Sequence, residues 1–196
     1  MSYFLEGPRV ALRPVAAEDV ALFHTWINDP IVTHYMFFGQ KPATREAAAK
    51  ILDGWVGADS HAVFAVVDKR HRRTIGLAGL YDIHPTARKA EYRILLGDRA
   101  VWNTGYGTEV TRLLTWYGFD RLNLNRLWLG VTHENLGGVR AYEKGGYRRE
   151  GVLRQDIYRN GRYYDSVRMS ILREDYYPTR ASKDAAFFSR KAKGAR

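Results

Sequence analysis

The chain has 196 residues, of which 45% are hydrophobic, and a formal net charge of +10. This length predicts one domain with a core of ordinary size. The absence of cysteine excludes disulfides, a thiolate nucleophile and cysteine-ligated zinc. Because Met1 to Pro14 lacks the apolar stretch of a signal peptide and no apolar run approaches membrane-spanning length, we expect a soluble, cytoplasmic protein without membrane contact.

Charge separates an expected single domain, residues 1–177, from a basic C-terminal tail, residues 178–196. The tail holds six basic residues against one acidic residue. Such a tail is either a solvated extension or an arm that contacts RNA or the ribosome. Phe187 and Phe188 are the only hint that it docks on another surface.

The N-terminal half mixes helical and strand patterns. Val20, Phe23 and Ile27 recur at helical spacing, and Asp29-Pro30 ends that pattern. In chain order, the predicted elements are a strand at Val10–Pro14, a helix at Glu18–Ile27, a helix beginning at Thr44, and strands at His61–Val67, Thr74–Ile83 and Ala90–Leu96.

The C-terminal half begins with an apolar stripe that predicts a helix from about Tyr106 to Phe119. Next come a strand at Leu127–Val131, a helix capped by Asn135 and ended by Gly145-Gly146, and strands at Tyr147–Tyr158 and Arg162–Leu172. Asn160-Gly161 favours a type I′ hairpin turn between the last two strands. The order predicts an α/β (α+β) fold with a mixed, mostly antiparallel twisted sheet flanked by helices.

Several kinds of site are excluded by the motifs. No glycine is followed by lysine, so there is no P-loop, and no G-x-S-x-G nucleophile elbow occurs. The six histidines show no metal-ligand spacing, so no metal is expected. The pair Gly105-x-Gly107 lacks the third glycine of the dinucleotide fingerprint.

The run Trp102-Asn103-Thr104-Gly105-Tyr106-Gly107-Thr108-Glu109 is the strongest remaining motif. Two glycines just before a helix form a group of backbone N–H donors that suits a pyrophosphate. Glu91 stands fourteen residues before Gly105, and Tyr142 stands seven residues after Asn135.

Together these stretches, with Val10 to Pro14 and Asn135 to Tyr147, resemble the GNAT superfamily of acetyl-CoA-dependent N-acetyltransferases. The resemblance spans about Arg9 to Tyr176 and looks like the RimJ/RimL-type branch. One departure is Trp102, which stands where the family's pyrophosphate loop often has Gln or Arg. Arg99 or Arg112 could then supply the missing positive charge.

The resemblance implies a fold in which two parallel strands splay apart around the pantetheine arm of acetyl-CoA. Here the strands would be Ala90–Gly97 and Leu127–Val131. The N–H of Leu95 would point at the thioester oxygen. The implied acetyl-CoA-binding residues are Leu95, Leu96, Gly97, Trp102, Asn103, Thr104, Gly105, Tyr106, Gly107, Thr108, Asn135 and Tyr142.

The reaction needs a neutral amine, and a lysine-like amine with pKa about 10.4 is protonated at pH 7. Glu91 is the expected general base, although it could instead be a surface carboxylate, and His34, Asp82 and Asp165 are reserves. The family resemblance makes Tyr142 the acid that protonates the departing thiolate, although it could be a core aromatic. Without a cysteine, direct transfer in a ternary complex is expected.

The acceptor amine is the least determined part. The resemblance places its site between the first two helices and the last hairpin, and several aromatics there could hold a cation. The candidates are Trp26, His34, Tyr35, Met36, Phe37, Phe38, Tyr163, Tyr164 and Asp165. A protein N-terminal α-amine, a polyamine and an aminosugar or aminoglycoside all remain possible acceptors. The alternatives are a CoA-binding or a ribosome/RNA-binding module without catalysis, and a monomer or homodimer.

Overall fold

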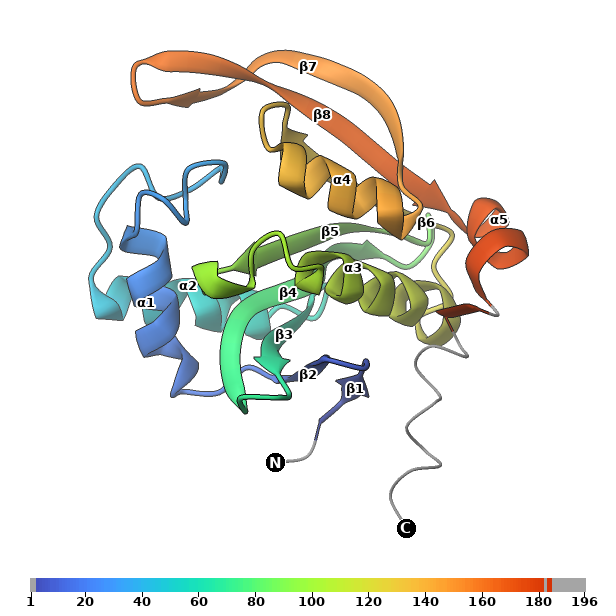
Figure 1. The fold of residues 1–196 in the computed structure, drawn as a ribbon, viewed down its shortest axis with the longest axis horizontal. Helices are drawn as coiled ribbons and strands as arrows, with labels where there is room; N and C mark the ends of the chain where they lie inside the picture. The colour runs from blue at the N-terminus through green and yellow to red at the C-terminus, as the bar shows by residue number, and fades with distance from the viewer. Residues whose placement is uncertain (1–2, 182, 185–196) are drawn as a thin grey trace.

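The computed structural model describes residues 3–181 and 183–184, and it confirms the predicted α/β sheet (Figure 1). Strands β1 to β8 span Leu5–Glu6, Val10–Pro14, Ala62–Asp68, Arg73–His84, Lys89–Leu96, Arg126–Thr132, Arg148–Arg159 and Arg162–Leu172. Helices α1 to α5 span Asp19–Asn28, Arg45–Val56, Tyr106–Trp116, Leu136–Gly145 and Arg173–Tyr176. Short 3-10 or π-helical turns lie at Arg99–Val101, Tyr117–Arg121 and Tyr177–Ala181. The two-residue strand β1 has no counterpart among the predicted elements.

The eight strands form one sheet in the order β1-β2-β3-β4-β5-β6-β8-β7. Every neighbouring pair is antiparallel except β5 and β6, which are parallel. That parallel pair is short. Its register is Lys89 with Arg126, Ala90 with Leu127 and Glu91 with Trp128, and it stops there. Beyond Glu91, β5 continues against β4 while β6 continues against β8, so the two strands part and leave a gap between them.

Two cores lie on opposite faces of this sheet. One contains Val110 and Leu113 of α3, Val139 of α4 and strand residues such as Tyr92. The other contains residues of α1 and α2 together with Leu95. Since neighbouring residues of a strand point to opposite faces, the alternation in β5 supplies both cores from one strand.

Local sequence explains where the helices near the gap begin and end. The residue preceding α3, Gly105, has φ of 90°. The Asn135 side chain caps α4 by accepting from the Gly138 N–H at 2.9 Å, and Gly146 with φ of 99° ends it. Asn160 and Gly161 both have positive φ, as the predicted type I′ turn requires.

The hairpin β7–β8 extends over α4 and reaches toward the loop between α1 and α2 (Figure 1). Arg159, at the end of β7, is 5% exposed and holds that loop. Its guanidinium donates to the backbone oxygens of Met36, Phe38 and Gly39 at 3.1, 2.9 and 3.2 Å. It also donates to the Thr33 hydroxyl at 2.9 Å. Burial among these neutral acceptors lowers the pKa of Arg159.

The expected tail begins with a contact to the domain. The Asp184 side chain is 1% exposed and accepts from Arg112 of α3, with Nε at 2.8 Å. A role of Arg112 at the phosphates would compete with this pair, which leaves the exposed Arg99 as the other expected cation. Phe187 and Phe188 lie outside the described residues, and the boundary at residue 177 stays a prediction.

Candidate active site

The N-terminus of α3 lies at the loop Trp102–Gly105. Asn103 and Gly105 have φ of 57° and 90°, and such left-handed residues turn successive N–H groups toward one side. The N–H groups of Tyr106, Gly107 and Thr108 belong to the first turn of α3, where no intrahelical acceptor exists. This arrangement can hold a diphosphate, as the sequence predicts.

The N-terminus of α4 lies beside the same loop. A Cβ on Gly137 would lie 3.3 Å from the Asn103 side-chain oxygen, and one on Gly107 would lie 4.0 Å from Cβ of Ala141. The same Cβ on Gly107 would lie 3.7 Å from Leu96 of β5. The loop, both helices and β5 therefore meet at one place, beside the gap between the strands.

Arg9 braces this loop, a role that the sequence patterns do not reveal. Its guanidinium donates to the Thr104 oxygen at 2.9 Å and lies 4.6 Å from the centre of the Tyr106 ring. The buried Glu109 carboxylate accepts from the N–H groups of Arg9 and Val10 at 2.8 and 3.0 Å, and from Arg9 Nε at 3.0 Å. The start of α3 is thus tied to the start of β2.

The backbone of β5 corrects one expectation about the gap. Gly97 N donates to the Ile75 oxygen of the β4 side at 3.0 Å, and the groups of one strand alternate in direction. The N–H of Leu95 therefore points to β4 and not into the gap. The oxygen of Leu96 points the other way, since it accepts from the Trp102 indole at 2.8 Å. Ile94 and Leu96 are the residues whose N–H groups face the gap.

Tyr142 lies on α4 at the face that packs against α3. Its ring meets Tyr92 of β5 edge-on with centroids 6.0 Å apart, and Tyr147 at 6.3 Å. Among the described residues its hydroxyl has no hydrogen-bond partner, whereas the hydroxyls of Tyr92 and Tyr147 meet Thr111 and Thr115 at 3.2 Å. Burial raises the pKa of Tyr142 to about 12, so this phenol keeps its proton at neutral pH and can donate it.

Glu91 lies on β5 at the last paired position before the strands part. One of its carboxylate oxygens accepts from Arg93 at 2.5 Å. That arginine is also 3.4 Å from the Asp82 carboxylate and stacks on the Tyr81 ring at 4.7 Å. The other Glu91 oxygen has no hydrogen-bond partner among the described residues, which leaves it available to a substrate amine.

The two candidate catalytic residues stand on opposite faces of the sheet. Tyr142 packs on Tyr92, and Glu91 is the preceding residue of the same strand, so its side chain points to the other face. A substrate can meet both side chains only through the gap between β5 and β6. We call the face of β5, β6 and β8 that carries Glu91 and Trp128 the acceptor face.

The reserve bases are placed differently from Glu91. Asp82 is 64% exposed in its ion pair with Arg93. Asp165 accepts from the Gln155 N–H at 2.8 Å, in a bulge of the hairpin. His34 stacks edge-on against Tyr35 at 4.6 Å, in the loop held by Arg159.

The aromatic acceptor candidates separate into core and loop residues. Trp26 is 6% exposed and packs so closely on Gly97 that a Cβ there would lie 2.0 Å from its ring. Tyr163 and Tyr158 stack at 4.9 Å at the hairpin tip, and Tyr164 is buried under Arg162. Phe37 is exposed and lies over Gly130 of β6, where a Cβ would be 3.6 Å from its ring.

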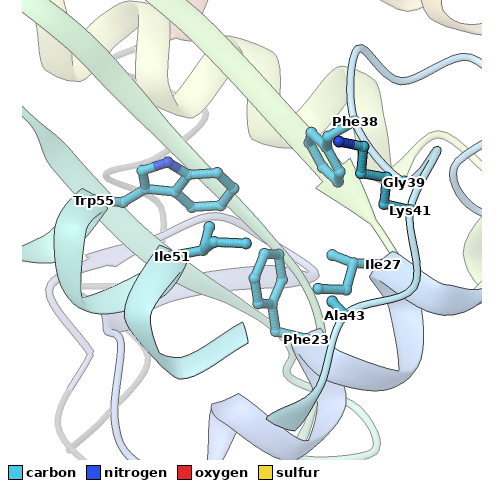
Figure 2. A pocket seen from close by; sticks show the side chains of 8 residues that line it. All are labelled: Phe23, Ile27, Phe38, Gly39, Lys41, Ala43, Ile51 and Trp55. Carbon is cyan, nitrogen blue, oxygen red and sulfur yellow. The ribbon is translucent and has the colours of Figure 1, made fainter. Parts of the chain in front are cut away.

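An apolar cavity of about 120 Å³ lies beside this region, between α1, α2 and the loop that joins them (Figure 2). It is lined by Phe23, Ile27, Phe38, Gly39, Lys41, Ala43, Ile51 and Trp55. No residue of β5 or of the phosphate loop lines it. The cavity is therefore separate from the gap, although Trp55 meets Tyr81 edge-on at 5.9 Å.

The motifs also gave no indication of two residues on the acceptor face, Trp128 and Arg168. Trp128 is the register partner of Glu91, and the guanidinium of Arg168 lies 4.3 Å from the Trp128 ring centre. Only the parallel pairing of β5 with β6 and the antiparallel pairing of β6 with β8 bring these side chains together, and neither pairing can be read from a local pattern.

Comparison with known proteins gives one consistent result. A family model described as acetyltransferase (GNAT) domain matches residues 9–148. Spermidine N(1)-acetyltransferase of Escherichia coli K12 is 31% identical over 175 residues, covering 85% of this chain and 88% of the relative. The putative ribosomal N-acetyltransferase YdaF of Bacillus subtilis is 29% identical over 152 residues, covering 76% and 82%.

A solved structure agrees with these relatives. The spermidine N-acetyltransferase of Vibrio cholerae, in complex with CoA and spermine, superposes with a TM-score of 0.78 at 28% identity, covering 86% of this chain and 98% of that chain. The chain belongs to the GNAT acetyltransferase family, and it is an acetyl-CoA-dependent N-acetyltransferase.

Two features are absent from the described residues. No three His, Asp or Glu side chains in residues 3–181 and 183–184 gather closely enough to hold a metal ion. In the same part of the chain, no helix is long and apolar enough to cross a membrane.

Proposed function

We propose that the protein transfers the acetyl group of acetyl-CoA directly to the primary amine of a small molecule, with Glu91 as general base and Tyr142 as general acid. The observation that carries the proposal is the gap: β5 and β6 part directly after Glu91, and the N-terminus of α3 lies beside the opening. The relatives named as spermidine acetyltransferases support a small-molecule acceptor over a protein N-terminus.

In this mechanism the acceptor amine approaches from the acceptor face. Glu91 takes a proton from the amine on its free oxygen, the amine nitrogen forms a bond to the acetyl carbon, and the bond from that carbon to sulfur breaks. Tyr142 gives its phenolic proton to the sulfur on the opposite face and regains one from solvent. The N–H groups that face the gap, those of Ile94 and Leu96, are available to the thioester oxygen.

The acetyl-CoA contacts follow from the same geometry. We propose that the amides of the Asn103–Thr108 loop bind the diphosphate, that Asn135 contacts the pantetheine arm while it caps α4, and that Leu96 and Gly97 border that arm. Trp102 belongs to this site through its bond to Leu96. An aromatic residue at this position also supports our proposal that the chain is of the RimJ/RimL type.

The test is an acceptor screen that detects release of the free CoA thiol. It includes spermidine, aminoglycosides, free amino acids, and peptides that begin with Ser or Ala. Turnover of peptides alone would overturn the small-molecule acceptor. If acetyl-CoA raises the melting temperature while no amine gives turnover, the protein is a CoA-binding module and the proposed reaction is wrong.

A further inference from the structure

We propose that Arg168 and Trp128 form a subsite for an anionic group, so that the acceptor is an amine that also carries a carboxylate or a phosphate. The inference rests on the proposed function, because it concerns the acceptor of that reaction. It narrows the small-molecule class and predicts discrimination against a bare polyamine.

Arg168 is a cation of the acceptor face whose charge acts on Glu150 without a hydrogen bond between them. Its guanidinium is half-buried on the Trp128 ring, at 4.3 Å from the centre, and within residues 3–181 and 183–184 it makes no hydrogen bond or ion pair. Its nitrogens are not among the side-chain atoms sealed from solvent without a partner. A planar guanidinium fixed in this way presents its free N–H groups to a ligand, a geometry that suits carboxylate or phosphate oxygens.

The acids of the same face are already engaged. Glu150 accepts from Arg126 and from the Ser170 hydroxyl, each at 2.7 Å. The Arg126 contact, with smaller contributions from Ser170 and from the nearby charge of Arg168, lowers the pKa of Glu150 to about 2. Arg93 binds both Glu91 and Asp82. The Arg126–Glu150 pair is therefore neutral, while the group of Glu91, Asp82 and Arg93 has a net charge of −1.

The face thus carries two opposite charges next to each other. The negative group surrounds Glu91 on β5, and the positive charge of Arg168 lies over Trp128 on the neighbouring strand β6. Neighbouring strands are about 4.8 Å apart, so the two charges are separated by roughly one or two strand spacings. This pattern complements a zwitterion whose amine points to Glu91 and whose anionic group reaches Arg168.

The surroundings limit the size of such an acceptor. Gly130 follows Trp128 by two residues on the same face, and Phe37 of the α1–α2 loop covers it. Since Arg168 is the register partner of Gly130, Phe37 closes the subsite at the end away from Glu91. A compact amine such as an ω-amino acid suits this space.

The experiment compares amines that differ only in an anionic group. The pairs are cadaverine with lysine, putrescine with ornithine, and ethanolamine with phosphoethanolamine; the first two report on a carboxylate and the third on a phosphate. For the wild-type protein we expect kcat/KM to favour the anionic member of at least one pair by about 10- to 100-fold, the range of a charged hydrogen bond.

Variants of Arg168 assign the preference to this residue. The measured quantity is the ratio of kcat/KM for the anionic amine to kcat/KM for its partner. Arg168→Gln should bring this ratio close to one by raising KM for the anionic amine, and Arg168→Glu should bring it below one. Arg168→Lys should keep part of the wild-type preference. The matched control is Arg121→Gln, which removes another arginine stacked on a tryptophan, Trp116, at the far side of the domain. Its ratio should equal that of the wild type.

Two results overturn the subsite. One is a wild-type preference for cadaverine and putrescine over their anionic partners, and the other is an unchanged ratio in folded Arg168→Gln. Calorimetry of lysine and cadaverine binding in the presence of CoA tests the subsite even if no amine is acetylated. Selective lysine binding that is lost in Arg168→Gln would then support the subsite while the proposed reaction fails.

Discussion

Arg9 and Glu109 lie a hundred residues apart in sequence, yet Arg9 donates to Glu109 through both its backbone N–H and its side-chain Nε. The carboxylate also accepts from Val10 and is 4% exposed. This contact fixes the first turn of α3 against the start of β2. The position of the proposed diphosphate site thus depends on a residue that need not touch the ligand.

Glu109→Gln should therefore act mainly on acetyl-CoA binding. An amide cannot accept from the three donors as the carboxylate does, so we expect a loss of about 1 to 3 kcal/mol of unfolding free energy and a severalfold rise in KM for acetyl-CoA. Denaturant unfolding and initial rates measure the two effects. Glu143→Gln, which breaks the exposed pair with Arg149, is the control and should change neither by much. An unaltered KM in Glu109→Gln would refute the bracing role.

Tyr142→Phe should lower kcat by about 100-fold or more while leaving the KM for acetyl-CoA close to that of the wild type. The substitution keeps the ring contact with Tyr92 and removes only the hydroxyl. Tyr147→Phe is the matched control, since Tyr147 is a neighbouring buried tyrosine whose hydroxyl meets Thr115. Equal loss of kcat in both variants would assign the effect to packing rather than to proton transfer.

The buried tyrosines also predict a weakness at high pH. Burial raises the pKa of Tyr142 to about 12, and it raises the pKa of Tyr92 and Tyr147 above the ordinary 10. The folded state holds these protons where the unfolded chain releases them. Their stabilisation is therefore complete below pH 10 and is lost as the pH rises through 12. Melting temperatures measured from pH 8 to 12 should fall beyond pH 10, and less steeply in Tyr147→Phe. A level profile would contradict this.

Arg159→Lys should impair use of the acceptor and spare acetyl-CoA. Lysine cannot reproduce the fork that bonds the three loop oxygens and Thr33, so the loop between α1 and α2 loses its support. We expect KM for the amine to rise about tenfold with an unchanged KM for acetyl-CoA. Arg162→Gln removes an exposed arginine of the same hairpin that pairs with Glu134, and it should leave both constants unaffected. A rise in both KM values for Arg159→Lys would contradict a role confined to the acceptor.

Local patterns predicted most of the fold. The helix that follows Gly105, the Asn135 cap and the Asn160-Gly161 turn all appear where spacing and turn chemistry place them. Strand β1 was missed because two residues, Leu5 and Glu6, cannot show a period. The roles assigned to Glu91 and Tyr142 remain predictions.

The features that sequence could not supply depend on contacts between distant segments, and two of them depend on strand register. The pairing of β5 with β4 decides whether the backbone N–H of Leu95 or that of Leu96 faces the gap. A shift of that register by one residue would exchange the two. The neighbourhood of Glu91, Trp128 and Arg168 likewise requires two strand pairings between distant segments. The Arg159 contacts join residues more than a hundred positions apart.

The support that Arg159 gives to the α1–α2 loop has a consequence for protein engineering. The segment that covers the acceptor face takes its shape from an arginine that lies outside it, near the tip of the last hairpin. Transplanting this loop alone into another acetyltransferase would carry over its side chains without its conformation. The loop and the hairpin therefore form a single transferable unit. Chimeras that receive one without the other should bind acetyl-CoA normally but recognise the acceptor amine of this protein poorly.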